Sequence, residues 1–127
     1  MNRVIIATPY KGKTESEIIA NVEYARQAMM DSIRRGESPF APHLLYPQVL
    51  DDGIRVQREM GMACGLNWIH AADNLIVYTD LGISDGMKAG IALANRIGLK
   101  VFYRSINHAD DKDPSSDPAN DIEPLKQ

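Results

Sequence analysis

Two short runs of β-branched and other apolar residues predict strands that are buried on both faces. Residues 3–8 (Arg-Val-Ile-Ile-Ala-Thr) end at Pro9, and residues 73–79 contain Leu-Ile-Val-Tyr. Continuous apolar runs of this length are typical of the inner strands of a parallel sheet. A further strand is predicted over residues 100–103. The three prolines in residues 38–47 leave room only for a brief central strand, with an irregular ordered loop around it.

Between these strands, apolar side chains recur at steps of three and four residues, which predicts helices. The first helix covers residues 15–35 and is closed by Gly36, the second covers residues 54–70, and the third follows the turn at residues 82–86 and ends at Gly98. The recurring positions are Ile18, Val22, Ala25, Met29 and Ile33 in the first helix, Val56, Met60, Ala63, Cys64, Asn67 and Trp68 in the second, and Met87, Ile91, Ala94 and Ile97 in the third.

Strands that alternate with helices of this length favour parallel pairing through right-handed crossovers. We therefore predict an α/β fold, an open, doubly wound, Rossmann-like parallel sheet of four or five strands with flanking helices. In such a sheet the ligand crevice lies beyond the carboxyl ends of the strands, near the point where the connections change direction. Side chains on the loops at that edge are the first candidates for chemistry.

Charge divides the chain of 127 residues into two parts. Residues 1–104 carry 12 basic and 11 acidic side chains, whereas residues 105–127 carry 2 basic and 6 acidic ones and almost no apolar residues. We predict one α/β domain over residues 1–104, a size that fits a single hydrophobic core. The acidic, proline-containing remainder cannot bury enough to hold itself folded. It is expected to be a mobile, solvated tail or, alternatively, an arm that docks on a neighbouring subunit.

Composition disfavours several classes of function. The near-neutral domain lacks a stripe of Lys and Arg, so we expect no binding to duplex nucleic acid. No apolar run approaches the roughly 18–20 residues of a membrane span, and the amino terminus lacks the apolar segment of a secretory signal, so a cytoplasmic protein is expected. We predict neither a cofactor nor a metal site, because His43, His70 and His108 lack the spacing of metal ligands. Cys64, the single cysteine, is predicted to be a buried structural thiol.

Three loops are expected at the carboxyl edge of the sheet, at residues 8–12, 41–47 and 79–86. The third is the most informative, because Ser84, Asp85 and Gly86 stand at the start of a helix. Free backbone N–H groups and the helix dipole attract anions at such a place, so these residues are candidates to hold a phosphate. Alternatively, Ser84 only caps the helix.

The other two loops offer aromatic and polar side chains. Tyr10 is placed to stack on a base, and Lys11 and Lys13 add positive charge, although their loop lacks the spacing of the phosphate-binding Gly-rich loops. His43 either donates a hydrogen bond to a ligand or is a structural histidine that is satisfied within the protein.

Charged residues near the second helix are interpreted as structural. Asp51, Asp52, Arg58 and Glu59 are expected to be charges around the first turn of that helix. Asp73 precedes a strand and is expected to be a turn or capping residue at the opposite, amino-terminal end of the sheet.

Five segments in the same order resemble the nucleoside 2-deoxyribosyltransferase-like family, in particular its small phage and bacterial members. They are Ala-Thr-Pro-Tyr-Lys-Gly at residues 7–12, Asn-Val-Glu-Tyr-Ala-Arg at 21–26, the segment 41–52, Arg-Glu-Met-Gly-Met at 58–62 and Ile-Ser-Asp-Gly-Met at 83–87. The resemblance covers roughly residues 3–104. It implies a homo-oligomer whose pockets accept a nucleoside or its 5′-phosphate. The ligand-binding residues expected on this basis are Thr8, Pro9, Tyr10, Lys11, His43, Tyr46, Ser84, Asp85, Gly86, Met87 and Gly90.

The sequence departs from this family at the residue that carries its chemistry. The resemblance implies a glutamate, four residues after the glycine of the Ser-x-Gly turn, that attacks the anomeric carbon of the sugar. In this chain that position is Gly90. A glycine there either opens the floor of the crevice for a bulkier nucleotide or allows close helix packing. Asp85, and less directly Asp80 or Glu59, are the carboxylates that could replace the missing nucleophile.

Two functions follow as hypotheses. The first is a catalytically weakened protein that binds a nucleotide or a nucleotide-derived signal, in the manner of a phage sponge that sequesters such a signal in the host cytoplasm. The second is an active N-glycosidase or deoxyribosyltransferase that uses Asp85 or another carboxylate. A third, purely structural possibility is an oligomer whose pocket stays empty.

Overall fold

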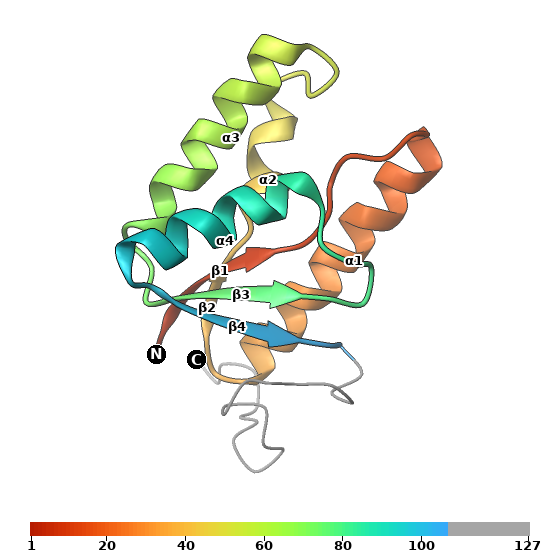
Figure 1. Cartoon of the computed structure of the whole chain (residues 1–127). Helices are drawn as coiled ribbons and strands as arrows, with labels where there is room; N and C mark the ends of the chain where they lie inside the picture. The colour runs from red at the N-terminus through yellow and green to blue at the C-terminus, as the bar shows by residue number, and fades with distance from the viewer. Residues whose placement is uncertain (107–127) are drawn as a thin grey trace.

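Four parallel strands form one open sheet in the computed structural model, which describes residues 1–106 (Figure 1). The strands are β1 (Arg3–Ala7), β2 (Ser38–Phe40), β3 (Asn74–Tyr78) and β4 (Lys100–Arg104), in the order β2-β1-β3-β4 across the sheet. Each neighbouring pair is parallel. The chain places β2 on one side of β1 and β3 on the other, so the connections change direction between β1 and β3. The predicted α/β fold, an open doubly wound parallel sheet, is confirmed.

Three long helices cover the two faces of this sheet. Helix α1 (Glu15–Arg34) lies against one face and α4 (Asp85–Ile97) against the other, whereas α3 (Arg55–Ile69) packs beside α4 and α2 and reaches the second face only at its C-terminal end, around Ile69 (Figure 1). Each begins and ends within a residue or two of the predicted range. The predicted acidic tail lies, from residue 107 onward, outside the described residues.

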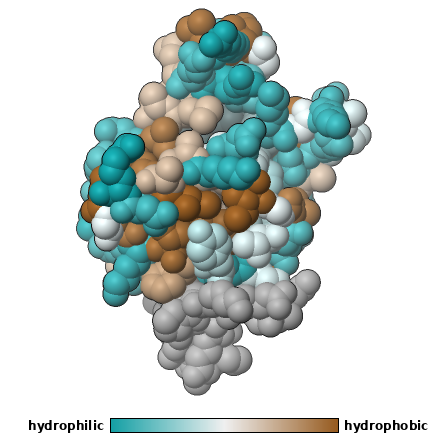
Figure 2. Space-filling view, viewed as in Figure 1, coloured by the Kyte–Doolittle hydropathy of each residue, from teal (hydrophilic) through white to brown (hydrophobic). Residues whose placement is uncertain are grey.

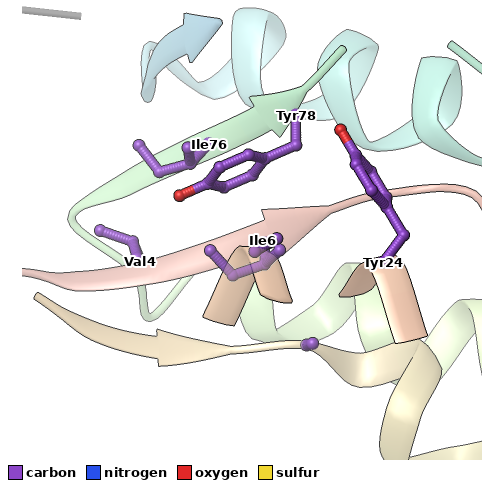
Figure 3. Packing of buried hydrophobic residues seen from close by; sticks show 7 residues of the cluster. Val4, Ile6, Tyr24, Ile76 and Tyr78 are labelled. Carbon is purple, nitrogen blue, oxygen red and sulfur yellow. The ribbon is translucent and has the colours of Figure 1, made fainter. Parts of the chain in front are cut away.

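Each inner strand contributes to two hydrophobic cores. Val4 and Ile6 of β1 and Ile76 and Tyr78 of β3 point toward α1, where they meet Tyr24 (Figure 3). Alternate residues of the same strands point the other way, because successive side chains of a strand lie on opposite faces. The continuous apolar runs in the sequence therefore supply both cores. The second core consists of Ile5, Leu75 and Val77 of the sheet, Ile69 of α3, and Met87 and Ala94 of α4.

Two glycines end helices where the sequence predicted. Gly36 and Gly98 have positive φ angles of 84° and 78°, a conformation that costs residues with a side chain free energy but suits glycine. Their backbone N–H groups bond to the carbonyls of Ile33 and Asn95 at 2.9 and 3.3 Å. These bonds turn the chain sharply from each helix into the next strand.

The proline-containing segment after β2 is more regular than predicted. It forms the short helix α2 (Pro42–Leu45) and a 3₁₀ turn, η1 (Tyr46–Gln48), instead of an irregular loop. Each proline stands in the first turn of its element, where the missing N–H group has no intrahelical role. The prolines therefore start these elements rather than break them, and they fix the positions of His43 and Tyr46.

The prediction that Cys64 is a buried thiol is wrong, because its side chain is exposed. Within α3, Ile69 is the only residue that is fully buried. The helix turns Gly61 and Gly65 toward the η1 and α2 segments, where a Cβ at Gly65 would lie 3.0 Å from the Cβ of Pro42. The side of α3 that carries Cys64 therefore faces outward.

Asp73 lies at the amino-terminal end of the sheet, as predicted. Its carboxylate accepts a hydrogen bond of 2.8 Å from the backbone N–H of Arg3, the first residue of β1. This bond and a side-chain bond from Arg3 hold the pKa of Asp73 below its ordinary value. Asp73 thus aligns β3 with β1 and stands far from the carboxyl edge.

A network of buried charges joins β4, β3 and α1. The Arg104 guanidinium, at the end of β4, donates to both carboxylate oxygens of Glu37 at 2.7 and 2.6 Å. It also donates to the hydroxyl of Tyr78, which in turn donates to Asp31 at 2.7 Å. Burial alone would lower the pKa of Arg104, but Glu37 outweighs it and raises that pKa. The network ties the edge strand β4 to the far end of α1.

Candidate functional site

A cavity of about 940 Å³ opens at the carboxyl ends of β1 and β3, where the connections change direction. Ile5, Ile6 and Leu75 of these two strands form part of its floor, and the floor is therefore continuous with the buried core. Its sides come from α3, from the start of α4, and from the segments that follow β1 and β2. This is the place that the predicted topology assigned to a ligand.

The structure brings the predicted ligand-binding residues together around this one cavity, with a single exception. Pro9 is buried and does not line it. The three loops singled out from the sequence therefore converge, although they are far apart along the chain. The predicted residues that line the cavity are Thr8, Tyr10, Lys11, His43, Tyr46, Ser84, Asp85, Gly86, Met87 and Gly90.

Thr8 and His43 form a hydrogen-bonded pair in the cavity wall. The Thr8 Oγ1 lies 2.5 Å from the Nε2 of His43, and Thr8 is buried. Burial lowers the pKa of His43 to about 4, so its imidazole is neutral near neutral pH. His43 is therefore satisfied by Thr8 within the protein and also lines the cavity, and its predicted hydrogen bond to a ligand stays a prediction. A neutral pair of this kind can offer hydrogen bonds to a sugar hydroxyl or a base without adding charge.

Acid is expected to destabilise the protein through His43 between about pH 6.5 and pH 4. The folded state keeps the imidazole neutral down to a pKa of about 4, whereas the unfolded chain takes up a proton near its ordinary value of 6.5. The unfolded state binds more protons in this window, so the free energy of unfolding falls as the pH falls, by at most about 3 kcal/mol in total. Urea unfolding at a series of pH values measures this slope.

The variant His43→Gln is expected to flatten the slope in this window. His70→Gln, which removes an exposed imidazole outside the cavity, is the matched control. Equal slopes for the wild type and His43→Gln would show that His43 is not the residue responsible.

The first turn of α4 faces the cavity with a capped helix start. Ser84 caps the helix as the simpler interpretation proposed, since its hydroxyl accepts a hydrogen bond of 3.3 Å from the Met87 N–H. The backbone N–H groups of Asp85 and Gly86 have no acceptor within the helix, because the first turn lacks preceding carbonyls. Ser84, Asp85 and Gly86 therefore line the cavity with hydrogen-bond donors and the positive end of a helix dipole.

Arg58 is a cavity residue that the sequence did not reveal. It was interpreted as a first-turn charge, but the half-buried side chain lines the cavity. Among residues 1–106, no ion pair involves its guanidinium. Arg55, one turn earlier, is exposed and pairs with Glu59 at 3.1 Å. A partly buried cation without a carboxylate partner is a suitable contact for an anionic ligand.

The carboxylates of the cavity lie toward solvent or have other partners. The Asp85 side chain is fully exposed and is 3.8 Å from Lys88. Glu17 is exposed and accepts a hydrogen bond from the backbone N–H of Lys13. Asp52 is half-buried. The burial of Tyr10 and, to a smaller extent, the negative charge of Asp52 raise the pKa of Tyr10. Asp52 is thus the least exposed of the three acidic residues that line the cavity.

Two other proposed substitutes for the family glutamate lie elsewhere. Asp80 does not line the cavity, and its carboxylate accepts hydrogen bonds from Tyr24, Ser105 and the backbone of Ile106. Burial would raise the pKa of Asp80, but these bonds outweigh it and lower that pKa. Glu59 also lies outside the cavity lining, in its pair with Arg55. Of the substitutes suggested by the sequence, only Asp85 reaches the cavity.

Gly90 is buried in the cavity wall, on the inner side of α4. A Cβ at this position would meet only the Cδ1 of Ile69 at 3.6 Å, an ordinary van der Waals contact. Close helix packing therefore does not require a glycine here, in contrast to Gly65. The missing side chain leaves space in the cavity instead.

Two tyrosines line the cavity from different segments. The Tyr46 hydroxyl accepts a hydrogen bond of 2.7 Å from the Trp68 indole, which fixes its ring against α3. The backbone carbonyl of Tyr10 accepts a hydrogen bond of 3.0 Å from Asn21 of α1. The ring of Tyr46 is therefore held by a neighbouring helix, and the backbone of Tyr10 is fixed against α1.

The described residues offer no cluster for a metal and no membrane helix. Within residues 1–106, no three His, Cys, Asp or Glu side chains lie close enough together to hold a metal ion. None of the helices in the same range combines the length and the apolar character needed to cross a bilayer.

Comparison with solved structures places this geometry among known folds. Five solved chains match, and one of them is a 2-deoxyribosyltransferase from the psychrotolerant bacterium Bacillus psychrosaccharolyticus, described as a biocatalyst for the synthesis of nucleosides. The two chains superpose with a TM-score of 0.58 over 81% of this chain and 72% of the other, at 20% sequence identity. At this identity the similarity shows a shared fold. None of the curated protein sequences matches. The chain belongs to the family described as Domain of unknown function (DUF7768), whose model matches residues 2–104.

Proposed function

We propose that this protein binds a nucleotide, or a signal derived from one, in the cavity at the carboxyl edge of the sheet. The observation that carries the proposal is the unpaired, half-buried Arg58 in the same cavity as the first turn of α4. Together they form an anion-binding site on an otherwise largely apolar cavity. A nucleotide combines an anionic group with a planar apolar one, and it fits both parts.

Each part of such a ligand has a suitable contact. The phosphate binds the N–H groups of Asp85 and Gly86 and the Arg58 guanidinium. The base stacks against Tyr10 or Tyr46, and the Thr8–His43 pair bonds to the sugar or the base edge. Lys11 lies at the exposed rim and adds positive charge.

Binding without rapid cleavage is favoured by the position of the carboxylates. A nucleophile for the anomeric carbon has to lie inside the cavity, but Asp85 points to solvent and Gly90 has no side chain. The alternative, an N-glycosidase or deoxyribosyltransferase, is supported by the shared fold and by Asp52, which is half-buried in the cavity. A binder that does not turn its ligand over would sequester it, which suits the sponge suggested by the sequence resemblance.

Mass spectrometry separates these functions directly. The full chain is incubated with a mixed pool of nucleosides, nucleotides and cyclic dinucleotides, and both released bases and ligands recovered after denaturation are measured. We expect a phosphorylated ligand to be recovered intact in stoichiometric amount. Accumulation of free base would establish the enzyme instead, and recovery of neither would leave the purely structural function.

The variant Arg58→Gln is expected to weaken binding of the recovered nucleotide about 10-fold or more, because a hydrogen bond to a charged group contributes roughly 1.5–3 kcal/mol. Isothermal titration calorimetry of the nucleotide and of its dephosphorylated form measures the effect. Only the phosphorylated ligand is expected to lose affinity.

Arg55→Gln is the matched control, since Arg55 lies on the same helix but outside the cavity lining. An equal loss in both variants would point to a general effect of charge. An equal loss for the two ligands would place the phosphate away from Arg58. The homo-oligomer and the host cytoplasm implied by the resemblance stay predictions.

A further inference from the structure

Polar side chains of α1 bond to two of the loops that lead to the cavity. Asn21 and Tyr24 lie three residues apart and therefore share one side of the helix, in its N-terminal half. Asn21 contacts the loop after β1, and Tyr24 contacts the loop after β3. Both loops pass beside α1 in Figure 1. One helix thus reaches two segments that lie far apart along the chain.

The Asn21 amide holds the loop that carries Tyr10 and Lys11. Its Nδ2 donates to the backbone carbonyl of Tyr10 at 3.0 Å and to that of Lys11 at 3.4 Å. The same loop lies close against the first turn of α1, where a Cβ at Gly12 would be 2.6 Å from the Cβ of Glu17. From Lys11 to Glu17 the chain has only polar residues and glycine, and the surface around this end of α1 is mostly hydrophilic (Figure 2). Hydrogen bonds and close backbone contact, rather than apolar burial, therefore fix this segment.

The Tyr24 hydroxyl holds the loop after β3 through two groups of Asp80. It donates to the Asp80 carboxylate at 2.5 Å and accepts a bond of 3.0 Å from the Asp80 backbone N–H. The ring of Tyr24 is buried in the core and points from α1 toward the end of β3 (Figure 3). The apolar residues that follow, Leu81 and Ile83, are exposed at 51% and 39%, so their burial does not anchor the loop. Asp80 therefore connects a fixed core side chain to the loop that leads to Ser84 at the start of α4.

We infer that Asn21 and Tyr24 are positioning residues for the nucleotide site, an inference that rests on the proposed function. Neither residue lines the cavity, but each fixes a segment that leads into its lining. Asn21 acts on the loop that presents Tyr10 and Lys11 to a base. Tyr24 acts on the loop before the N–H groups of α4 that would receive a phosphate. Because both bonds come from one helix, α1 sets the distance between the base contact and the phosphate contact.

The expected effect of each bond is moderate and differs in kind. A loop that is already ordered binds more tightly than one that has to be ordered on binding, because the ordering costs free energy. Each loop keeps another contact when its bond to α1 is removed, from Glu17 to the Lys13 N–H and from Ser105 to Asp80. We therefore expect each variant to lose about 3- to 10-fold in affinity, the equivalent of one hydrogen bond.

Binding to the variants Asn21→Ala and Tyr24→Phe tests the inference. Both are expected to fold, since alanine favours a helix and phenylalanine keeps the ring in the core. Equilibrium dialysis of the full chain against a pool of nucleosides, nucleotides and cyclic dinucleotides selects the nucleotide that the wild type binds most tightly. Calorimetry then compares that nucleotide with its phosphate-free nucleoside. Asn21→Ala is expected to weaken both, because it loosens the base contact, whereas Tyr24→Phe is expected to weaken only the phosphorylated compound.

Tyr78→Phe is the matched control for Tyr24→Phe. It also removes a buried hydroxyl from the same core, but the Tyr78 hydroxyl bonds to Asp31 and Arg104, which do not line the cavity. This variant is expected to lower stability without lowering affinity. Gln27→Ala, at an exposed position of α1, is the control for Asn21→Ala and is expected to bind like the wild type.

Hydrogen exchange of the protein without nucleotide gives an independent readout. Backbone amides of residues 10–13 are expected to exchange faster in Asn21→Ala only, and those of residues 79–84 in Tyr24→Phe only. A wild type that binds no nucleotide of the pool would overturn the proposed function and this inference with it. Unchanged affinity in both variants, beside a wild type that binds, would overturn this inference alone. An equal loss of affinity in Tyr78→Phe and Tyr24→Phe would also overturn it, since affinity would then follow stability rather than loop position.

Discussion

Replacing Gly90 with glutamate is expected to raise the rate of base release from 2′-deoxynucleosides at least about 100-fold above the wild-type background. The position lies in the cavity wall, and a Cβ there meets only an ordinary contact with Ile69. A carboxylate at this point can attack or stabilise the oxocarbenium-like anomeric carbon as the base departs, and removal of such a nucleophile commonly costs several powers of ten in rate. Chromatography of the freed bases measures the result.

Two variants at the same position separate chemistry from shape. Gly90→Gln fills the same volume without a nucleophile, and Gly90→Ala adds only a methyl group. Both are expected to remain at the background rate. If Gly90→Gln matched Gly90→Glu, the gain would come from packing, and if the wild type were already as fast as Gly90→Glu, another carboxylate would be at work, with Asp52 the first to replace.

Replacing Arg104 with methionine is expected to lower the free energy of unfolding by about 3–5 kcal/mol, because it leaves Glu37 charged and buried with a hydrogen bond from Ser32 but without its cationic partner. A domain of this size has roughly 5–15 kcal/mol of stability in total, so the loss is a large fraction of it. The Tyr78 hydroxyl loses a donor in the same change. Urea unfolding, followed by circular dichroism, gives the value.

The matched control is Arg55→Met, which breaks an exposed pair with Glu59. Exposed pairs contribute roughly 0–1 kcal/mol, so little change is expected. The double variant Arg104→Met/Glu37→Gln is expected to recover part of the loss, since both charges are then gone. A loss in Arg104→Met no larger than in Arg55→Met would mean that the buried pair contributes nothing beyond a surface pair.

The sheet and its loops were predictable because burial on both faces leaves a clear trace in the sequence. Strand β3 is a short run of residues that are buried at every position, a pattern typical of an inner strand. Gly36 and Gly98 mark helix ends because glycine adopts the positive φ angle of a helix end at little cost. Once the strands are known to be parallel, the loops after β1 and β3 must share one edge. Residues as distant as Tyr10 and Ser84 could therefore be assigned to one cavity before any coordinates.

The roles of residues on α3 were not predictable in the same way. Arg55 and Arg58 are both basic residues in the first turn of a helix, so the sequence does not show which of them faces the cavity. They differ because the contacts of Gly61 and Gly65 with η1 and α2 rotate Arg58 into the cavity. Cys64 was misjudged for the same reason, since apolar periodicity identifies a face without saying what covers it.

The buried network could not be found by reading the chain. Arg104 and Glu37 are 67 residues apart, and each looks like an ordinary surface charge at the end of an element. Their pairing depends on where α1 ends relative to β4, which is a property of the packed fold.

The floor of the cavity is more deeply buried than the wall that α3 forms. The floor belongs to the two central strands, whose side chains are almost wholly buried, whereas the wall formed by α3 has Ile69 as its one fully buried residue. Local opening costs little where few apolar contacts are lost, so α3 can separate from the sheet while the strands stay intact. Any molecule that fills the cavity adds contacts to the weaker side. If the proposed ligand binds there, its occupancy and the order of α3 are therefore linked, because α3 has few buried contacts of its own.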